Sequence, residues 1–446
     1  MDKPLVYIAY QWVGPTGPIG NIRTPDIYDL GMVENHDKVH IQHGSRAAKE
    51  TFGPNCETYG NKTGTNFKCV SSASMSEDDV FMYPITLGHK DHLSMLFDHV
   101  FGLFERSRVP NQLLDLVRNG NGYILLEHGF EAFVEDENLD RMHEYFQMHQ
   151  IPFNKVLYSM GCGNIEEIYD FYCIKRNIPV HNRIKFHQFH PCQESLAINE
   201  MRHQYNPEYD PDHMPGKTFL SLNLRPRNHR TLLLGLFKKY GLLENSHFSY
   251  AGLMPGQSIC GMLDQMHLEA CGLDDEIYNE LNSEMEKYIL DEDPVNNCDV
   301  VYDMDSREYM KLYYDDSLVS VCTETTFHTT IMALTEKCIK PIAYKHPFIL
   351  CGAQGILKYI QGLGFKTFGD FWDEGYDEIY NPNERLVRIA QICQDINEWT
   401  TEQKLEFRKA VKPIIEHNYE LLITEPYSTV YKDMYDYVVQ SQEASK

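Results

Sequence analysis

The sequence lacks several features that would place it outside ordinary cytoplasmic globular proteins. Its apolar runs, such as residues 123–126 and 348–351, are much shorter than the roughly 20 residues that cross a bilayer. Its first residues, MDKPLVYIAYQWVG, lack the apolar core and small-residue cleavage site of a signal peptide. No Cys-x-x-Cys pair occurs among the 12 cysteines, which are thinly spread. We therefore expect a cytoplasmic protein with reduced thiols and no membrane span.

Basic residues are few compared with acidic ones. The chain has 40 Lys and Arg against 65 Asp and Glu, which gives a formal net charge of -25. The electrostatic field of this negative charge repels polyanions, so a nucleic acid partner would need a local basic groove on the protein. The residues in the first part of the chain that could supply one are Arg46, Lys49, Lys62, Lys68 and Lys90. The densest basic run lies elsewhere, at residues 225–239.

The 446 residues exceed the usual size of a single hydrophobic core, so we expect at least two domains. Strand-like apolar runs in the first half alternate with stretches of helical spacing, a pattern typical of βαβ units and a parallel sheet. The strand-like runs are residues 4–10, 80–85, 122–130, 154–161 and 183–191.

A Pro- and Asp-rich break, NPEYDPDHMPGK at residues 206–217, interrupts this pattern, which then restarts. We expect an α/β domain at residues 1–205, a second α/β domain at 217–400, and C-terminal helices at 401–446 that cross back to the first domain. The predicted fold class is therefore two Rossmann-like α/β domains facing a cleft, with a helical tail. This is the outline of a glycosyltransferase of the GT-B type.

The strongest motif is a strand, a basic loop and a helix at residues 219–230, FLSLNLRPRNHR. In α/β sheets, ligands bind beyond the carboxyl ends of strands, where helix N-termini offer free N–H groups. Arg225, Arg227 and Arg230 would meet a diphosphate there, and Asn223 ends the strand. The alternative is a solvated basic loop before a surface helix. Three arginines and a histidine within six residues of an acidic chain favour the ligand interpretation.

A second motif pairs Glu324, after a predicted strand, with Thr335, Glu336 and Lys337 at a predicted helix start. A carboxylate at a strand end in a nucleotide-binding sheet can accept hydrogen bonds from ribose hydroxyls. A carboxylate near a helix start can equally serve as a cap. The spacing leaves both alternatives open. A third, weaker motif is the turn CGAQG at residues 351–355, in which Gly352 either allows a ligand to approach or simply forms a turn.

The segments LSLNLRPRNHRTLLLGLFKKYGLL, LVSVCTETTF and the run from TEKCIKPIAY to FWDEGYD resemble glycosyltransferase-like proteins of large tailed phages and large viruses. The TEK element and the apolar strand after it are also similar to the donor site of α-1,3-fucosyltransferases. The resemblance covers residues 219–377. It implies that the three arginines face the diphosphate, that Glu324 and Glu336 lie around the ribose and sugar, and that Lys337 neutralises phosphate.

One departure from the fucosyltransferases limits what the resemblance implies. Their first glutamate is followed by asparagine, whereas Glu324 is followed by Thr325. The resemblance therefore does not carry guanine across as the base of the donor nucleotide.

Sugar transfer also needs a base for the acceptor hydroxyl. The best candidates in the first domain are Glu127 and His128, at the end of a predicted strand, although Glu127 can equally be an ordinary surface carboxylate. The Gly- and Pro-rich loop at residues 14–21 either lines the same cleft or is only a turn.

We expect no cofactor other than the nucleotide-sugar cosubstrate and no metal site. His187 and His190 are three residues apart on a predicted strand and so point to opposite faces. Asp303 and Asp305 form an Asp-x-Asp pair like the metal site of GT-A enzymes, but they fall late in the chain, and a metal site there is the minority interpretation.

Three functions remain as hypotheses. The first is transfer of a sugar from a nucleotide-sugar donor to a hydroxyl of a glycan or small molecule. The second is glycosylation of hydroxymethylated pyrimidines in viral DNA in the host cytoplasm, which would require a basic, aromatic-lined groove. The third is a non-catalytic module that binds nucleotide or sugar. Hydrolysis of a nucleotide sugar without acceptor would separate the enzymes from the binding module.

Overall fold

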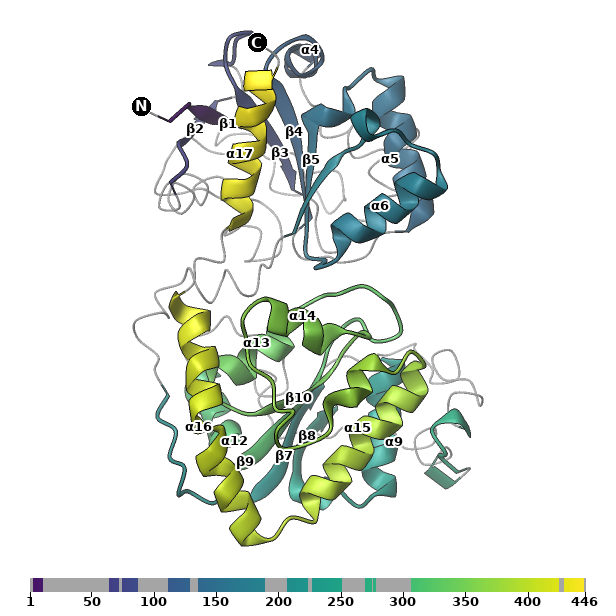
Figure 1. Cartoon of the computed structure of the whole chain (residues 1–446), viewed down its shortest axis with the longest axis vertical. Coiled ribbons are helices and arrows are strands. Elements are labelled where there is room, and N and C mark those ends of the chain that lie inside the picture. Colours follow the sequence, from purple (N-terminus) through teal and green to yellow (C-terminus); the bar gives the residue numbers. More distant parts are fainter. Residues whose placement is uncertain are drawn as a thin grey trace, which may run out of the picture. The chain divides into compact units, whose positions relative to one another are not determined.

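Two parallel sheets with helices around them make up the part of the chain that the computed structural model describes (Figure 1). That part comprises residues 3–10, 64–71, 74–86, 111–128, 135–188, 207–223, 227–250, 269–274, 276–277, 306–424 and 429–444. The chain divides into unit 1, formed by Met1–Ser195 and Pro426–Lys446, and unit 2, formed by Leu196–Glu425. The predicted α/β class with parallel sheets is confirmed.

Unit 1 contains a six-stranded sheet in the order β2-β1-β3-β4-β5-β6, with every pairing parallel. Its strands are β1 (Val6–Tyr10), β2 (Phe67–Ser71), β3 (Phe81–Thr86), β4 (Gly122–His128), β5 (Val156–Met160) and β6 (Lys185–Gln188). The central strands are continuous apolar runs because a parallel sheet is covered on both faces. Five consecutive residues of β5, for example, are all buried.

The described helices of unit 1 come from two separate parts of the chain, residues 111–175 and residues 429–444. They are α4 (Asn111–Asn119), α5 (Asp136–Met148), α6 (Ile165–Lys175) and α17 (Thr429–Ala444), with short 3-10 turns η4 (Phe153–Lys155) and η5 (Val180–Asn182). Tyr431, Met434 and Val438 of α17 share a buried cluster with Ile8 and Leu125 of the sheet. The end of the chain therefore supplies part of the core of the first unit.

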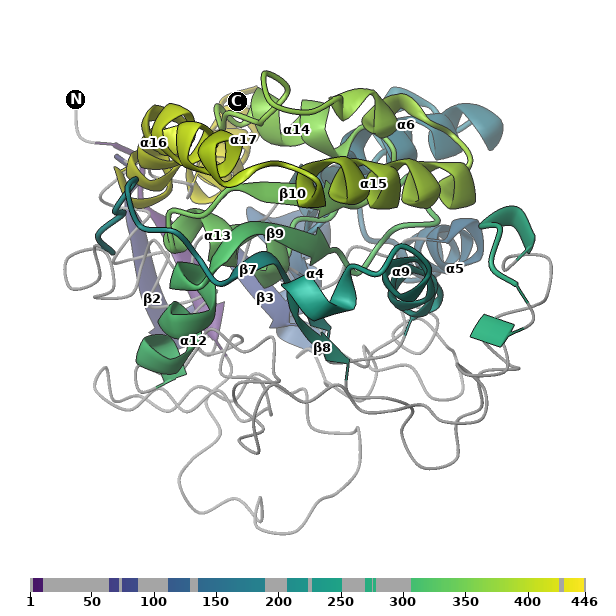
Figure 2. The same cartoon turned by 90° about the horizontal axis from the view of Figure 1, so that it is seen from below.

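Unit 2 contains a four-stranded parallel sheet in the order β10-β9-β7-β8. Its strands are β7 (Lys217–Asn223), β8 (Ser246–Tyr250), β9 (Ser317–Thr323) and β10 (Phe348–Cys351). Its helices are α9 (Asn228–Lys239), α12 (Ser306–Asp315), α13 (Glu336–Ala343), α14 (Ile356–Gly362), α15 (Pro382–Asn397) and α16 (Thr401–Thr424), with 3-10 turns η6 (Leu243–Asn245) and η8 (Glu374–Glu378). Figure 2 shows α9 and α15 on one side of this sheet and α12, α13 and α16 on the other.

The Pro- and Asp-rich segment, where we expected a linker, packs against α16 in its described part. The Tyr209 hydroxyl donates to the Arg408 carbonyl over 3.1 Å, and the Arg408 guanidinium donates to the Asp210 carbonyl over 2.6 Å. Lys409 forms an ion pair with Asp212. These contacts attach the segment to unit 2. Of the two helices in the expected C-terminal tail, α16 belongs to unit 2 and α17 to unit 1.

None of the helices in the described ranges combines the length and the apolar character that spanning a membrane requires.

Candidate functional site

The candidate site lies at the carboxyl ends of β7 and β9, which are neighbours in the sheet of unit 2. From β7 the chain passes through α9 to β8 on one side, whereas β9 pairs with the opposite side of β7. Among the described strands, the order therefore changes direction between β7 and β9. Open parallel sheets bind ligands at the carboxyl ends of strands beside such a switch point. Here those ends are Asn223 and Thr323.

A buried set of hydrogen bonds joins the two strand ends. The Thr323 hydroxyl donates to Asn223 Oδ1 over 2.5 Å, and Asn223 Nδ2 donates to Ser221 Oγ over 3.0 Å. The Ser221 hydroxyl donates to the Val321 carbonyl over 3.2 Å. Both polar atoms of the Asn223 side chain thus bond within the sheet. Asn223, a predicted donor-binding residue, lies beneath the site and fixes the spacing of its strands.

The start of α9 is bonded to the end of β9. His229 Nε2 donates to the Glu324 carbonyl over 2.9 Å, and the Arg230 guanidinium donates to the Thr323 carbonyl over 3.1 Å. Arg230 is only 1% exposed. Burial and the neighbouring Arg230 hold the pKa of His229 well below its ordinary value, so the ring is neutral and carries its proton on Nε2. Arg230, which the sequence placed facing a diphosphate, here joins helix to strand.

Arg227 differs from Arg230 because it is exposed to solvent. It is the N-cap residue of α9 with an extended backbone, φ -144° and ψ 154°. Its carbonyl accepts from the amide and the hydroxyl of Thr231, over 3.0 and 3.1 Å. The backbone of Arg227 therefore begins the helix while its side chain extends from the helix N-terminus, where a partial positive charge attracts anions.

Glu324 joins the end of β9 to the start of α13. Its carboxylate is buried and accepts from the Thr335 amide over 3.0 Å and from the Thr335 hydroxyl. Thr335 is the N-cap of α13, and its Oγ1 accepts from the Lys337 amide over 3.4 Å. Of the two alternatives that the sequence left open for Glu324, these bonds support the one in which it organises a helix start.

The segment that follows Glu324 is held by a stack of three side chains. The Phe327 ring lies 5.0 Å from the His229 ring at an interplanar angle of 18°, and the Arg385 guanidinium lies 4.6 Å from the Phe327 ring centre. Arg385 also donates to the carbonyls of Phe327 and Ile379, each over 2.6 Å. Arg385 could not be identified from the sequence, because no local motif links α15 to the segment around Phe327, 58 residues away.

The small turn that contains Gly352 serves packing within the chain. A Cβ atom at Gly352 would lie 3.0 Å from Ile356 Cγ2. The Asp377 carboxylate accepts from the amides of Leu357 and Lys358 at the start of α14, over 3.1 and 3.2 Å. Burial raises the pKa of this carboxyl. The sequence did not single out Asp377. Its carboxylate occupies the N-terminus of α14, next to the turn for which the sequence left the approach of a ligand open.

The remaining predicted residues are only partly described. Lys337 lies in the first turn of α13 and is half-buried, whereas Glu336 is placed by its backbone alone. Glu127 and His128 end β4 in unit 1, and their side chains fall outside the described residues. The predictions that lie outside the described residues altogether concern Arg225, the loop at 14–21, His190, the Asp303 and Asp305 pair, and the basic residues Arg46, Lys49, Lys62 and Lys90.

Lys68, the described member of the basic set, is exposed on β2. His187 is buried on β6, and burial lowers its pKa to about 3. Within the described ranges, no group of three or more His, Cys, Asp or Glu is arranged to hold a metal ion.

Comparison with solved structures gives remote likenesses, two of which are named here. α,α-Trehalose 6-phosphate synthase from Burkholderia multivorans is 13% identical, with 84% of this chain and 74% of that chain covered and a TM-score of 0.43. The N-terminal domain of Candida albicans trehalose-6-phosphate phosphatase is 11% identical, with 91% and 78% covered and a TM-score of 0.40. Neither likeness is close enough to assign a fold or an activity. No protein-family model and no curated protein matches the chain.

Proposed function

We propose that unit 2 binds the diphosphate of a nucleotide sugar at the switch point between β7 and β9, and that the chain is a metal-independent glycosyltransferase. One observation carries the proposal. The start of α9 and the start of α13 are both bonded to Glu324 at the end of β9, so two helix N-termini converge on one sheet edge. Helix N-termini at such an edge bind phosphate through backbone N–H groups and the helix dipole.

The charged side chains divide into two roles in this proposal. Arg227 extends from the start of α9 and contacts the diphosphate, and Lys337 in the first turn of α13 adds a second positive charge. Arg230 and Glu324 hold the two helix starts in place through buried bonds. We assign Arg225, which lies between β7 and α9 in the sequence, and Glu336, the first residue of α13, to the same donor site.

Transfer requires stabilisation of the departing diphosphate and removal of a proton from the acceptor. Charge accumulates on the leaving oxygens, and a guanidinium offers them two donors in a fixed plane. We assign the proton transfer to Glu127 or His128 at the end of β4, the strand-end position that is accessible to ligands in parallel sheets. The acceptor is a hydroxyl of a glycan or small molecule.

The proposal is tested by a thermal-shift screen of UDP, GDP, CMP and their sugars. A ligand that binds only the folded state raises the free energy of unfolding by mass action, by about 2.7 kcal/mol at a hundred times its Kd, and so raises the melting temperature. We expect one nucleotide series to raise it, Arg227→Ala to abolish the shift, and Arg388→Ala to preserve it. Arg388 is a matched control because it is partly exposed on α15 and pairs with Asp373 over 2.9 Å.

Hydrolysis of the stabilising nucleotide sugar without acceptor then separates an enzyme from a binding module. Hydrolysis that disappears in Arg227→Ala supports a transferase. Binding with no turnover of any nucleotide sugar supports the non-catalytic alternative. The donor-site proposal is wrong if no nucleotide shifts the melting temperature, or if Arg227→Ala responds like the wild type.

A further inference from the structure

His328 lies in the segment that follows Glu324 and contacts the start of α9. Its ring is 5.9 Å from the ring of His229, the second residue of that helix, at an interplanar angle of 61°. It is 5.3 Å from the Phe327 ring at an angle of 79°. Whereas His229 and Phe327 are buried, His328 is exposed to solvent. The exposed ring therefore lies at the same helix N-terminus from which Arg227 extends.

The segment that carries His328 is fixed on both sides of this residue. Before it, Phe327 is held in the buried stack between α9 and α15. Around it, the Thr326 hydroxyl donates to the Ile331 carbonyl over 3.2 Å, and the Ile331 amide donates to the Thr329 hydroxyl over 3.3 Å. A side chain on a segment held in this way loses little conformational freedom when it binds a ligand.

Positive charge is concentrated at this helix start. Burial is the main reason that the pKa of His229 is low, and the charges of Arg230 and His328 lower it further. Arg227 acts in the same direction, so all three basic groups lie within electrostatic range of one ring. The Glu324 carboxylate at the end of β9 is bonded to the start of α13.

Arg385, on α15, adds a buried positive charge behind the segment. The residue is 2% exposed, and its guanidinium donates to the carbonyls of Phe327, Ile379 and Tyr380. No carboxylate in the described ranges forms an ion pair with it. Asp377, whose charge acts on it, is bonded to the start of α14 instead. A buried cation without a direct counter-ion favours an anion nearby.

On the basis of the function proposed for unit 2, we propose that His328 is a further donor-binding residue, whose imidazole contacts the diphosphate beside Arg227 and holds a proton there. An imidazole with an ordinary pKa of about 6.5 changes its charge between about pH 5 and 8, and a neighbouring phosphate favours the protonated ring. Binding of the donor therefore takes up a proton. Affinity is highest at low pH, and the gain is lost as the ring deprotonates.

Calorimetric titration with UDP-glucose and GDP-mannose between about pH 6 and about pH 8 tests this role. The diphosphate of these probes is esterified at both ends and does not titrate in this range, so a pH dependence of binding belongs to the protein. For the probe that binds, wild-type affinity should fall about three- to tenfold from the lower to the higher pH. This is the effect expected of one charge-assisted hydrogen bond at a partly exposed site.

Three variants assign the pH dependence to one residue. His328→Gln should bind equally at both pH values, with the affinity that wild type has at the higher pH. His328→Arg should bind tightly at both, because a guanidinium stays charged throughout. His213→Gln is the matched control, since His213 is an exposed histidine in the segment before β7, at the amino end of the same sheet. It should keep the wild-type pH dependence, and all three variants should melt close to wild type.

Proton uptake separates a ligand contact from a packing role. Binding heats measured in two buffers of different ionisation enthalpy should show uptake of part of a proton near pH 7 by wild type and none by His328→Gln. A pH dependence and proton uptake that persist in His328→Gln overturn the role of His328, while the donor site stands if Arg227→Ala still weakens binding. If neither probe binds wild type, the donor site fails and the role of His328 fails with it.

Discussion

The two units use polar side chains in contrasting ways. At the sheet edge of unit 2, Arg230, His229 and Glu324 are buried, and each bonds to another element of the same unit. On the helical layer of unit 1, Arg183 and Lys185 form ion pairs with carboxylates that remain largely exposed. A buried polar network holds its side chains in a single geometry. An exposed ion pair does this weakly, because it contributes only about 0 to 1 kcal/mol to the free energy of unfolding. Unit 2 thus has a fixed polar edge suited to a ligand, whereas the ion pairs of unit 1 lie at its surface.

The largest expected effect is on stability in unit 2. Arg230→Ala should lower the free energy of unfolding by about 3 kcal/mol or more, because it leaves a cavity and an unbonded Thr323 carbonyl. Denaturant unfolding followed by tryptophan fluorescence is a suitable measurement, since two of the three tryptophans, Trp372 and Trp399, lie in unit 2. Arg227→Ala is the control and should cost little. Equal losses in both variants would remove the distinction between the buried and the exposed arginine.

The next effect concerns activity rather than stability. Arg227→Ala should lower the transfer rate by about 10²-fold or more while the melting temperature stays within a few degrees of wild type. Arg227→Lys should recover only part of the rate, because an ammonium keeps the charge but loses the two parallel donors. Rates and nucleotide affinity are measured with the donor found in the thermal-shift screen. Unchanged rates at normal stability would make Arg227 an ordinary surface arginine.

The difference between Arg227 and Arg230 shows which features of the site can be predicted from the sequence and which cannot. The strand at 217–223 and the helix after it were predictable, because an apolar run, a basic loop and a helical pattern follow one another. Which arginine is buried was not predictable. Arg227 is the N-cap residue, whereas Arg230 lies within the first turn of the helix, where packing against β9 decides its exposure.

Contacts between segments that are distant in the sequence could not be predicted either. Arg385 binds the segment after Glu324, and Asp377 caps α14, across separations of 58 and 20 residues. Neither residue belongs to a local motif that would indicate its partner. The sequence could identify Glu324 as a residue at a strand end, but only the position of Thr335 in space distinguishes a helix-organising carboxylate from one that is open to a ligand.

A smaller effect is expected from pH in unit 1. Burial lowers the pKa of His143 to about 4, and its Nε2 accepts from the Tyr169 hydroxyl, which itself accepts from the Ile184 amide. The unfolded chain protonates this histidine near its ordinary pKa of 6.5, so stability falls as pH drops from about 6.5 to 4. Allowing for its partial exposure, the loss is about 1 to 3 kcal/mol.

Hydrogen exchange of peptides from residues 136–186 measures this loss within unit 1. His143→Phe, which can keep the stacking on Phe153, should flatten the pH dependence of their protection. Subtracting the variant from wild type removes the contribution of other buried histidines, such as His346 in unit 2, whose pKa is also about 4. An identical pH dependence in the variant would show that His143 does not govern the acid response of unit 1.

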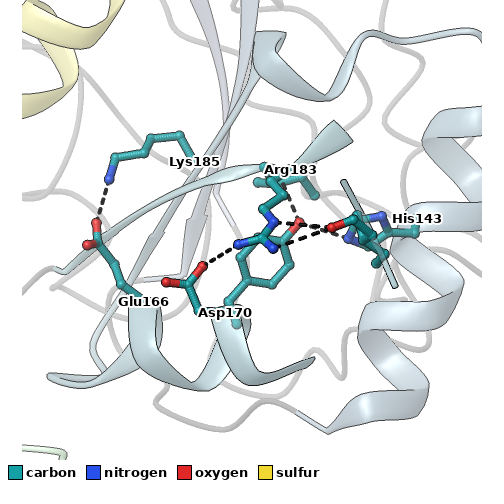
Figure 3. A network of polar contacts seen from close by, with 8 residues as sticks. His143, Glu166, Asp170, Arg183 and Lys185 are labelled. Carbon is teal, nitrogen blue, oxygen red and sulfur yellow. Dashed lines mark hydrogen bonds and ion pairs between the residues drawn. The ribbon is translucent and has the colours of Figure 1, made fainter. Parts of the chain in front are cut away.

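The smallest effect is expected at the ion pairs of Figure 3. Lys185→Met removes the partner of Glu166 but keeps most of the aliphatic side chain, and both charged groups are partly exposed. The variant should lose no more than about 0.5 kcal/mol, and the loss should vanish in 1 M salt, where screening acts within about 3 Å. Hydrogen exchange of residues 165–188 measures this loss of stability. Lys311→Met is the control, because it removes a comparable ion pair with Asp315 in unit 2 and shows how much such a pair contributes. A loss above about 2 kcal/mol that persists in high salt would place Lys185 beside Arg230 as a structural cation, and the contrast between the two units would not hold.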